Sequence, residues 1–329
     1  MIKLGVIILN WNGETLLKKF LPSVIRYTRG EEVELIVADN GSTDGSVKWL
    51  ETNHPELKLL KFEKNYGFAE GYNKAIGLTG YQYIVLLNSD VEVTEGWWQP
   101  LLSFMESHPE AGAIQPKIKS YKNKELFEYA GAAGGYLDRL GYPYCRGRLF
   151  DRVEKDEGQY DNVAEICWAS GAALTVRTEL YQELGGLDPL FFAHMEEIDL
   201  CCRMIRAGYK IYAIPDSQIY HLGGASLQQG DPKKTYLNFR NNLLLLYKNL
   251  PAKTRSRKLI IRRLTDTLAF LMYLLKLDFR NAGAIVRAHN DFRKMKRVYA
   301  NYPKVKKEFA FPGSERFILI DRYLLNKKK

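Results

Sequence analysis

Cysteine is scarce in this chain of 329 residues, which contains only four. Cys145 and Cys167 stand alone, and Cys201 and Cys202 are adjacent, so no C-x-x-C pair occurs. Neither a zinc site nor a disulfide framework is therefore expected. Because unpaired thiols persist in a reducing compartment, we expect the protein to reside in the cytoplasm.

Long hydrophobic runs are also missing. The longest comparable run, Leu268 to Leu275, has eight residues and lies between Asp266 and Lys276. A membrane-spanning helix needs about 20 apolar residues, so no such helix is expected. The N-terminal stretch "MIKLGVIILNWNG" is interrupted by asparagines and lacks a small-residue cleavage site. We interpret it as a first β-strand and not as a signal peptide.

Glycine-rich phosphate loops are absent as well. A dinucleotide-binding fold places G-x-G-x-x-G after its first strand, but this chain has "NWNGETL" there, and no P-loop ending in G-K-[ST] occurs. The chain thus has no glycine cradle that could surround phosphates with backbone N–H groups. If it binds a nucleoside diphosphate, a metal ion must screen the charge, and carboxylate ligands suit Mg²⁺ or Mn²⁺.

Acidic residues are few in the C-terminal third. Residues 233–329 hold 25 Lys/Arg and 6 Asp/Glu, whereas the first 232 residues hold 23 and 32, so the two parts carry +19 and −9. Long segments of helical character here combine apolar stripes with Lys/Arg. They are either a subdomain packed on the rest, with a solvated basic face, or helices lying on an anionic membrane surface. Nucleic acid is not expected as a partner, because no known binding module is recognisable.

Apolar strands alternate with helices in the first half of the chain. We expect strands at 3–10, 33–40, 58–63 and 83–90, with helices between them. This alternation predicts an α/β fold whose mostly parallel sheet is covered by helices on both faces. Residues 112–161 are less regular and suggest a functional loop or an acceptor-side subdomain. A strand is expected within 165–177 and a pair of short strands at 210–221, and a domain boundary is placed near residue 230.

Polar residues stand where the predicted parallel strands end. Asn10 ends the first strand, Asp39 ends the second, and Asn88 and Asp90 follow the buried run "YIVLL". Taken alone, Asp39 is explained by an Asx turn or helix cap, and Asp90 by a turn after a strand. However, ligands of such sheets bind beyond the carboxyl ends of the strands, so three polar strand ends favour a ligand site.

Five segments together resemble a known family. "VIILNWNG", "ADNGSTDGS", "NYGFAEGYNKAI", "LLNSDVEV" and the stretch from "SGAALTVR" to "YHLGG" stand in the order seen in family 2 inverting glycosyltransferases. Residues 4–228 particularly resemble the bacterial rhamnosyltransferase-like branch, which acts in cell-surface polysaccharide assembly. The resemblance implies a GT-A catalytic domain at 1–230, with a nucleotide-sugar half (1–115) and an acceptor half (116–230), followed by a basic helical region at 231–329.

The resemblance also implies partners and a cofactor. The donor would be a nucleotide sugar, with dTDP- or UDP-sugars favoured, and the acceptor a glycan or a lipid-linked glycan. A divalent cation, Mn²⁺ or Mg²⁺, would assist. With the basic C-terminal third, this places the protein on the inner face of the bacterial cytoplasmic membrane.

The resemblance assigns residues to the donor and metal sites. Asp90 matches the metal-binding last acid of the D-x-D signature, and His221 matches a second metal ligand. Asn88 replaces the first acid of that signature, which removes one negative charge. The residues implied in nucleotide-sugar binding are Asn10, Asp39, Asn65, Gly67, Asn73, Asn88 and Arg203.

The acidic segment "MEEIDL" is the expected position of the catalytic base. Glu197 stands where the family's E-D-x-D segment has Asp, and Glu196 and Asp199 are the alternatives. Burial and mutual repulsion of these acids would raise a carboxyl pKa. A different interpretation is a surface pair between Asp199 and Arg203 on a helix. Trp168 and Glu196 are assigned to the acceptor side.

Two other functions are considered. The departures at Asn88 and Glu197 would suit a non-catalytic, membrane-associated relative that acts as a scaffold. A sugar nucleotidyltransferase is disfavoured because its glycine-rich phosphate loop is missing.

Overall fold

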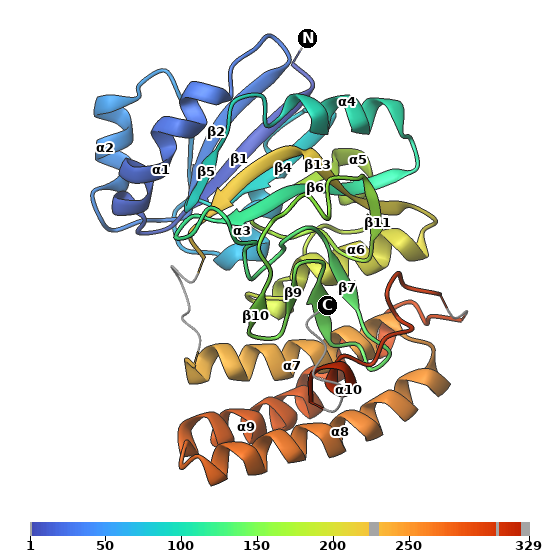
Figure 1. Ribbon diagram of the computed structural model, residues 1–329. Coiled ribbons are helices and arrows are strands. Elements are labelled where there is room, and N and C mark those ends of the chain that lie inside the picture. Colours follow the sequence, from blue (N-terminus) through green and yellow to red (C-terminus); the bar gives the residue numbers. More distant parts are fainter. Residues whose placement is uncertain (1, 224–229, 307–308, 324–329) are drawn as a thin grey trace.

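The computed structural model describes residues 2–223, 230–306 and 309–323 (Figure 1). A nine-stranded sheet forms the centre of the N-terminal part of the chain, residues 2–223, which is called the sheet half. Its first part is parallel and follows the predicted alternation of strands and helices. In sheet order these strands are β3 (Lys58–Lys61), β2 (Val33–Asp39), β1 (Leu4–Asn10) and β4 (Tyr83–Leu87). The connecting helices are α1 (Glu14–Tyr27), α2 (Ser46–Asn53) and α3 (Gly67–Gly77).

The second part of the sheet is mixed, because β12 runs antiparallel to both its neighbours, β4 and β6. The long strand β13 is parallel to β6 and antiparallel to β5 and β11. The bounds are β5 (Val91–Val93), β6 (Ala111–Ser120), β11 (Ala164–Ile166), β12 (Ala173–Arg177) and β13 (Lys210–His221). The remaining helices of this half are α4 (Gln99–Ser107), α5 (Thr178–Glu183), the short η1 (Pro189–Phe191) and α6 (Glu196–Arg206).

One strand prediction was wrong. The pair of short strands expected at 210–221 is the single strand β13, which absorbs an irregularity between Ile214 and Gln218 instead of breaking there. The Ser217 hydroxyl, buried inside this irregularity, donates a hydrogen bond to the carbonyl of Trp97. That bond holds the strand in place, so β13 continues to His221.

Alternate residues of the strands face two separate apolar clusters. Ile7 and Leu86 belong to one, whereas Ile8 and Leu87 belong to the other. Since successive strand residues point to opposite faces, the sheet is buried on both sides. This explains why the sequence of β4, YIVLL, is an unbroken apolar run.

The irregular middle section forms a small antiparallel sheet. Its strands, in chain order, are β7 (Gly135–Leu137), β8 (Pro143–Cys145), β9 (Arg148–Leu149) and β10 (Arg152–Val153). Gly135 lies directly under the Trp168 ring, where an added Cβ would approach ring carbon Cε2 to 2.0 Å. Only glycine allows this contact, which joins the small sheet to the central one.

The C-terminal region is helical, as predicted. It contains α7 (Pro232–Asn249), α8 (Ala252–Leu275), α9 (Phe279–Met295), the 3-10 helix η2 (Lys296–Asn301) and α10 (Ile318–Tyr323). Helix α7 lies between the sheet half and the outer helices α8 and α9 (Figure 1). Its leucines 243–246 belong to one of the main apolar clusters. Among the described helices, none is both long and apolar enough to cross a membrane. The domain boundary near 230 stays a prediction.

A buried ionic network connects α6 to α7. Asp199 accepts hydrogen bonds from Arg203 Nε (2.8 Å), Lys248 Nζ (2.8 Å) and Asn249 Nδ2 (2.8 Å). Burial opposes ionisation of Asp199, but the cations of Arg203 and Lys248 outweigh it and lower its pKa. The predicted surface pair between Asp199 and Arg203 is therefore wrong in its location, because both side chains are buried.

Replacing Asp199 by alanine should destabilise the protein strongly. Asp199→Ala would leave Arg203 buried without a carboxylate, and breaking a buried pair costs about 3–5 kcal/mol. Urea unfolding measures this free energy. The control is Glu51→Ala, which removes an exposed partner of Lys61 and should cost less than about 1 kcal/mol. Equal costs for the two variants would contradict the prediction.

Candidate active site

The strand ends of β1 and β2 meet in one polar cluster. Asn10 Nδ2 donates to Asp39 Oδ1 (2.9 Å) and to Ser42 Oγ (3.2 Å), and Asp39 Oδ2 accepts from the backbone N–H of Ser42 (2.9 Å). Asn10 and Asp39 are opposite each other in the parallel register. Asp39 thus bonds the backbone three residues ahead, one residue further than in the Asx turn considered for it, and this bond holds the carboxylate at the sheet edge. The predicted contact of both residues with a nucleotide stays a prediction.

The loop before α3 joins this cluster. Asn40 Nδ2 donates to Asn65 Oδ1 (3.1 Å) and to the carbonyl of Gly67 (3.0 Å). Gly67 has φ +79°, a conformation that glycine adopts without strain, and it begins α3. An added Cβ at Gly67 would lie 3.9 Å from the Phe192 ring, so this loop borders the segment that precedes α6. Asn65 and Gly67 therefore remain candidates for the donor site.

Asp90 and His221 come together although they are far apart in the sequence. His221 Nε2 lies 3.1 Å from Asp90 Oδ1, because the ends of β13 and β5 pair with each other. The second ring nitrogen, Nδ1, lies 3.5 Å from Glu128 Oε2. All three side chains are buried. Asn88, half-buried, precedes Asp90, and its backbone N–H bonds the carbonyl of Ala172 (3.0 Å).

The two carboxylates change the proton affinity of His221. Burial alone would lower the pKa of His221, but Asp90 and Glu128 outweigh it and raise the pKa to about 10. Burial also opposes ionisation of Asp90, yet the hydrogen bond from His221 lowers its pKa. Glu128 was missed from the sequence, since only the fold brings it to His221.

Asp90 and His221 fit a divalent cation as part of a larger ligand set. A carboxylate oxygen and an imidazole nitrogen are suitable donors for Mn²⁺, and His221 Nε2 lies 3.1 Å from Asp90 Oδ1, while Glu128 faces the other ring nitrogen, Nδ1, at 3.5 Å. Within the described ranges, however, no group of three or more His, Cys, Asp and Glu side chains is arranged to hold a metal ion alone. Substrate oxygens would have to complete the coordination.

Glu196 and Glu197 are the first two residues of helix α6. Each has one oxygen, Oε2, that is buried without a hydrogen-bond partner in the described structure. Burial raises the pKa of Glu197 to about 7. Burial and the charge of Glu197 raise the pKa of Glu196 well above its usual range. The raised pKa of both carboxyl groups agrees with the increase predicted from burial and mutual repulsion. Glu197 is therefore suited to accept a proton near neutral pH.

The segment before α6 has a strained backbone. Phe192, His194 and Met195 have φ of +67°, +69° and +73°, a region that side chains other than glycine rarely adopt. Helix α7 holds this segment from outside. Asn241 Nδ2 donates to the carbonyls of Phe191 (2.9 Å), Ala193 (2.8 Å) and His194 (2.7 Å). Arg240 Nη2 adds a bond of 2.7 Å to the carbonyl of Phe191. Sequence reasoning missed both residues, because nothing local links them to the acidic segment.

Asn241→Ala should release the segment that carries the acids. The variant loses the donor that satisfies three carbonyls, so we expect faster amide hydrogen exchange over residues 191–197. Hydrogen exchange with mass spectrometry measures this. The control is Asn290→Ala on the exposed face of α9, which should leave exchange there unchanged. Equal protection in wild type and Asn241→Ala would contradict the role given to Asn241.

Three predicted site residues also make hydrogen bonds within the protein. Asn73 accepts from Tyr181 OH (2.6 Å) and donates to the carbonyl of Leu187 (2.8 Å), so it joins α3 to the turn before η1. Arg203 donates to the carbonyls of Leu184 (2.6 Å) and Gly186 (2.7 Å) as well as to Asp199. The indole N–H of Trp168 donates to the carbonyl of Tyr136 (2.9 Å) under the small sheet. These bonds give the three side chains structural roles, and their predicted contacts with donor or acceptor stay predictions.

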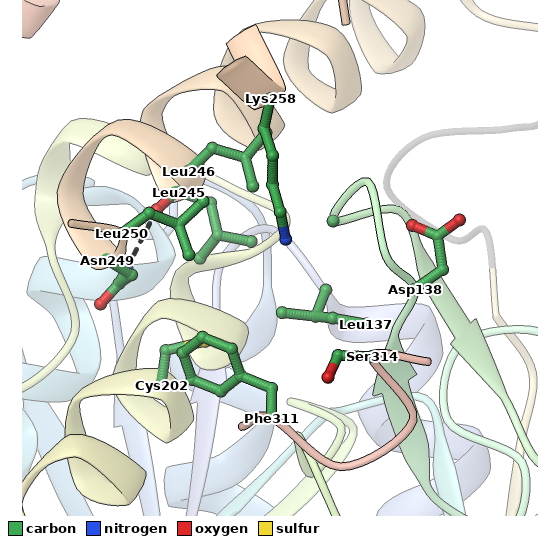
Figure 2. A pocket seen from close by; sticks show the side chains of 11 residues that line it. Leu137, Asp138, Cys202, Leu245, Leu246, Asn249, Leu250, Lys258, Phe311 and Ser314 are labelled. Carbon is green, nitrogen blue, oxygen red and sulfur yellow. Dashed lines mark hydrogen bonds between the residues drawn. The ribbon is translucent and has the colours of Figure 1, made fainter. Parts of the chain in front are cut away.

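Two cavities lie outside these clusters. The smaller, about 20 Å³, is bounded by α7, Leu137 of β7, Lys258 and Phe311 (Figure 2), and it holds no more than a water molecule. The larger, about 240 Å³, lies on the small sheet. Its lining combines aromatic and charged side chains: Tyr136, Tyr144, Tyr160, Arg146, Arg148, Arg316 and Glu154.

Comparisons with known proteins agree with one another. The family model "Glycosyl transferase family 2" matches residues 5–161. N-acetylglucosaminyl-diphospho-decaprenol L-rhamnosyltransferase of Mycobacterium tuberculosis is 26% identical over 234 residues, which cover 66% of this chain and 75% of that protein. Rhamnosyltransferase WbbL of Escherichia coli K12 is 23% identical over 223 residues, covering 66% and 82%.

The fold has solved counterparts. The crystal structure of GalNAc-T7 with UDP, GalNAc and Mn²⁺ matches with a TM-score of 0.58 at 18% identity and covers 75% of this chain. The chain spans about half of that protein, 48% of its length. At this identity the likeness concerns the fold.

Proposed function

We propose, since the chain belongs to glycosyltransferase family 2 and has a GT-A-like fold, that it transfers a sugar from a nucleoside-diphosphate sugar to a hydroxyl group. Within the family it belongs to the rhamnosyltransferase-like branch. The favoured donor is a dTDP- or UDP-sugar, with rhamnose or another hexose as the transferred group. The acceptor is a glycan or lipid-linked glycan of cell-surface polysaccharide synthesis.

The observation that carries the proposal is the pair of carboxyl groups at the start of α6, of which Glu196 is buried and Glu197 is half-buried. An inverting transfer is one displacement at the anomeric carbon and needs a single general base. Glu197 takes this role because its pKa of about 7 leaves it partly ionised at neutral pH while keeping its proton affinity high. Glu196 lies beside it, with a pKa that burial and the charge of Glu197 raise, and is assigned to acceptor binding.

Asp90 and His221 would hold a divalent cation, Mn²⁺ or Mg²⁺. When bound, the cation would supply positive charge that stabilises the departing nucleoside diphosphate. His221 must lose its proton to act as a ligand, and Glu128 then orients the ring through the other nitrogen. The GalNAc-T7 structure, solved with UDP and Mn²⁺, supports this assignment by analogy of fold.

The donor nucleotide would lie along the ends of β1, β2 and β4. Asn10 and Asp39 form the cluster at one side, and Asn65 and Gly67 border the other. Asn88 stands beside the metal ligand Asp90 and offers an oxygen without a charge. Asn73, Arg203 and Trp168 bond protein groups, as Asn10 and Asp39 do, and their predicted donor or acceptor contacts remain part of the proposal.

The proposed location is the inner surface of the cytoplasmic membrane. A lipid-linked acceptor would be present there, and the net charge of +19 over residues 233–329 would attract anionic lipids.

A donor panel tests the function. The chain is incubated with UDP-, dTDP- and GDP-sugars, Mn²⁺ and lipid-linked or soluble glycan acceptors, and the product is analysed by mass spectrometry and NMR. Transfer with an inverted anomeric configuration is the expected result. A product with retained configuration would contradict the single-displacement mechanism. No transfer from any donor, with intact membrane binding, would favour the scaffold alternative.

A further inference from the structure

Helix α8 buries two charged residues and exposes seven large apolar side chains, whereas an ordinary surface helix buries its apolar side. Its buried residues are Arg262 and Asp266, which bond each other (3.1 Å from Nη2 to Oδ1). Asp266 Oδ2 also lies 2.9 Å from His289 Nε2 of α9, and the Arg262 guanidinium lies 3.8 Å from the centre of the Tyr142 ring. Together with Leu259, which packs against the main apolar cluster, polar contacts therefore attach α8 to the protein, where a soluble protein normally uses mainly apolar ones.

The large apolar side chains of α8 point outward instead. The exposed ones are Ile260, Ile261, Leu264, Leu268, Leu271, Met272 and Leu275. Their spacing of three and four residues places them on one side of the helix. Leu277 and Phe279, in the turn to α9, are also exposed. We call this set the α8 apolar face. Contiguous apolar patches of this kind mark contact sites.

Lys and Arg side chains surround the α8 apolar face, and α8 itself has no exposed acidic residue. Lys253 and Arg257 continue the same row toward the N-terminus of the helix, Arg263 lies at its edge, and Lys276 and Arg280 follow at its other end. The five side chains are exposed. The only acidic residue of α8, Asp266, is buried beneath. In the turn, Asp278 caps α9 by accepting a hydrogen bond from the backbone N–H of Asn281 (3.1 Å). The face thus combines an apolar centre with a positive border.

We infer that the α8 apolar face inserts into the headgroup region of an anionic lipid bilayer. Leucine, isoleucine and methionine side chains would enter the acyl boundary while Lys and Arg side chains contact lipid phosphates. Figure 1 shows α8 and α9 as the outer layer, with α7 between them and the central sheet. This inference deepens the proposed location by naming the contact face.

A second copy of the chain suits this face less well. An isologous contact would bring the two basic borders together, and like charges across an interface oppose association. The charge pattern is complementary to an anionic membrane and not to itself. Oligomeric state is accordingly one arm of the test.

The test measures binding of the full chain to vesicles without any sugar nucleotide, so its outcome is independent of catalysis. Flotation should recover the protein with vesicles that contain phosphatidylglycerol, and much less with phosphatidylcholine alone or in high salt. Lys253→Gln, Arg257→Gln and Arg263→Gln combined should weaken binding roughly 100-fold. Leu264→Gln, Leu268→Gln and Leu271→Gln combined should weaken it at least about 10-fold.

A fluorescent label shows which face inserts. The four native cysteines are buried, so a new surface cysteine can be labelled selectively. An environment-sensitive dye on Leu268→Cys should shift to shorter wavelength on adding anionic vesicles. The control is Leu78→Cys, since Leu78 and Leu268 are 63% and 62% exposed but lie on different parts of the molecule. Its dye should not shift.

Several results would overturn the inference. One is the absence of binding to anionic vesicles, and another is binding that the leucine triple variant retains in full. A third is a wild-type dimer in analytical ultracentrifugation that the leucine variant converts to a monomer, which would assign the face to a second copy. Circular dichroism of each variant confirms that these exposed substitutions leave the fold intact.

Discussion

Glu197→Gln is expected to lower kcat for sugar transfer by about 100- to 10,000-fold, because the amide cannot accept the acceptor's proton. Donor affinity should change little, since the substitution keeps the size of the side chain and removes a charge only from the base position. Steady-state kinetics with the best donor of the panel, together with donor binding by calorimetry, measure the two quantities separately.

The pH dependence of kcat/KM tests the role of Glu197 as the base independently. Glu197 acts as a base only when ionised, and burial raises its pKa from the usual 4.5 to about 7. The wild-type kcat/KM should therefore rise with pH up to about 7, fall about tenfold per unit below that value, and level off above it. Glu197→Gln should lose this dependence.

The matched control is Glu183→Gln, an exposed residue at the end of α5. This variant should retain wild-type kcat and its pH profile. If Glu197→Gln were as active as Glu183→Gln, or if the wild-type profile had its midpoint near 4.5, the base would have to be another residue. Glu196→Gln would then be the next variant to measure.

Asp90→Asn should produce the second largest loss of activity, roughly 100- to 1,000-fold. A metal ion contributes several kcal/mol to stabilising charge in the transition state, and each 1.36 kcal/mol corresponds to a tenfold change in rate. The substitution preserves the shape of the side chain, but it removes the negative charge that would attract the cation. It also removes one of the two carboxylates that raise the pKa of His221.

Thermal denaturation with and without Mn²⁺ provides a readout besides activity. Mn²⁺ with a nucleoside diphosphate should stabilise the wild type, because a ligand that binds only the native state raises Tm. Asp90→Asn should lose this increase. The control is Asp216→Asn, an exposed acid on the same strand as His221, which should keep it. An equal Mn²⁺-dependent Tm shift in both variants would show that Asp90 does not hold the cation.

Much of the framework of the site follows from local sequence. The buried run "YIVLL" becomes β4, and Asn10 and Asp39 meet because adjacent parallel strands end at one edge. Glu196 and Glu197 begin a helix, as the segment "MEEIDL" predicted. Apolar periodicity and strand-end polarity act over a few residues, so they are readable without knowing the tertiary contacts.

The structural contacts of other site residues depend on distant partners and could not be predicted. Asn73 and Arg203 have the polar groups of a ligand site, and carbonyls from the 184–187 turn accept hydrogen bonds from both. Trp168, predicted on the acceptor side, covers Gly135. No local pattern distinguishes a polar side chain that binds a ligand from one that binds the protein's own backbone.

The sequence by itself determined the α/β alternation, the polar strand ends and the concentration of positive charge beyond residue 232. Only the tertiary structure decided that Glu128 lies beside His221, that Asn241 holds the strained segment before α6, and that the apolar side of α8 faces outward. The physical reason is that local periodicity fixes which residues share a face of an element. Which face becomes buried depends on the elements that pack against it, and for α8 the described structure buries Arg262 and Asp266 and leaves the apolar side exposed.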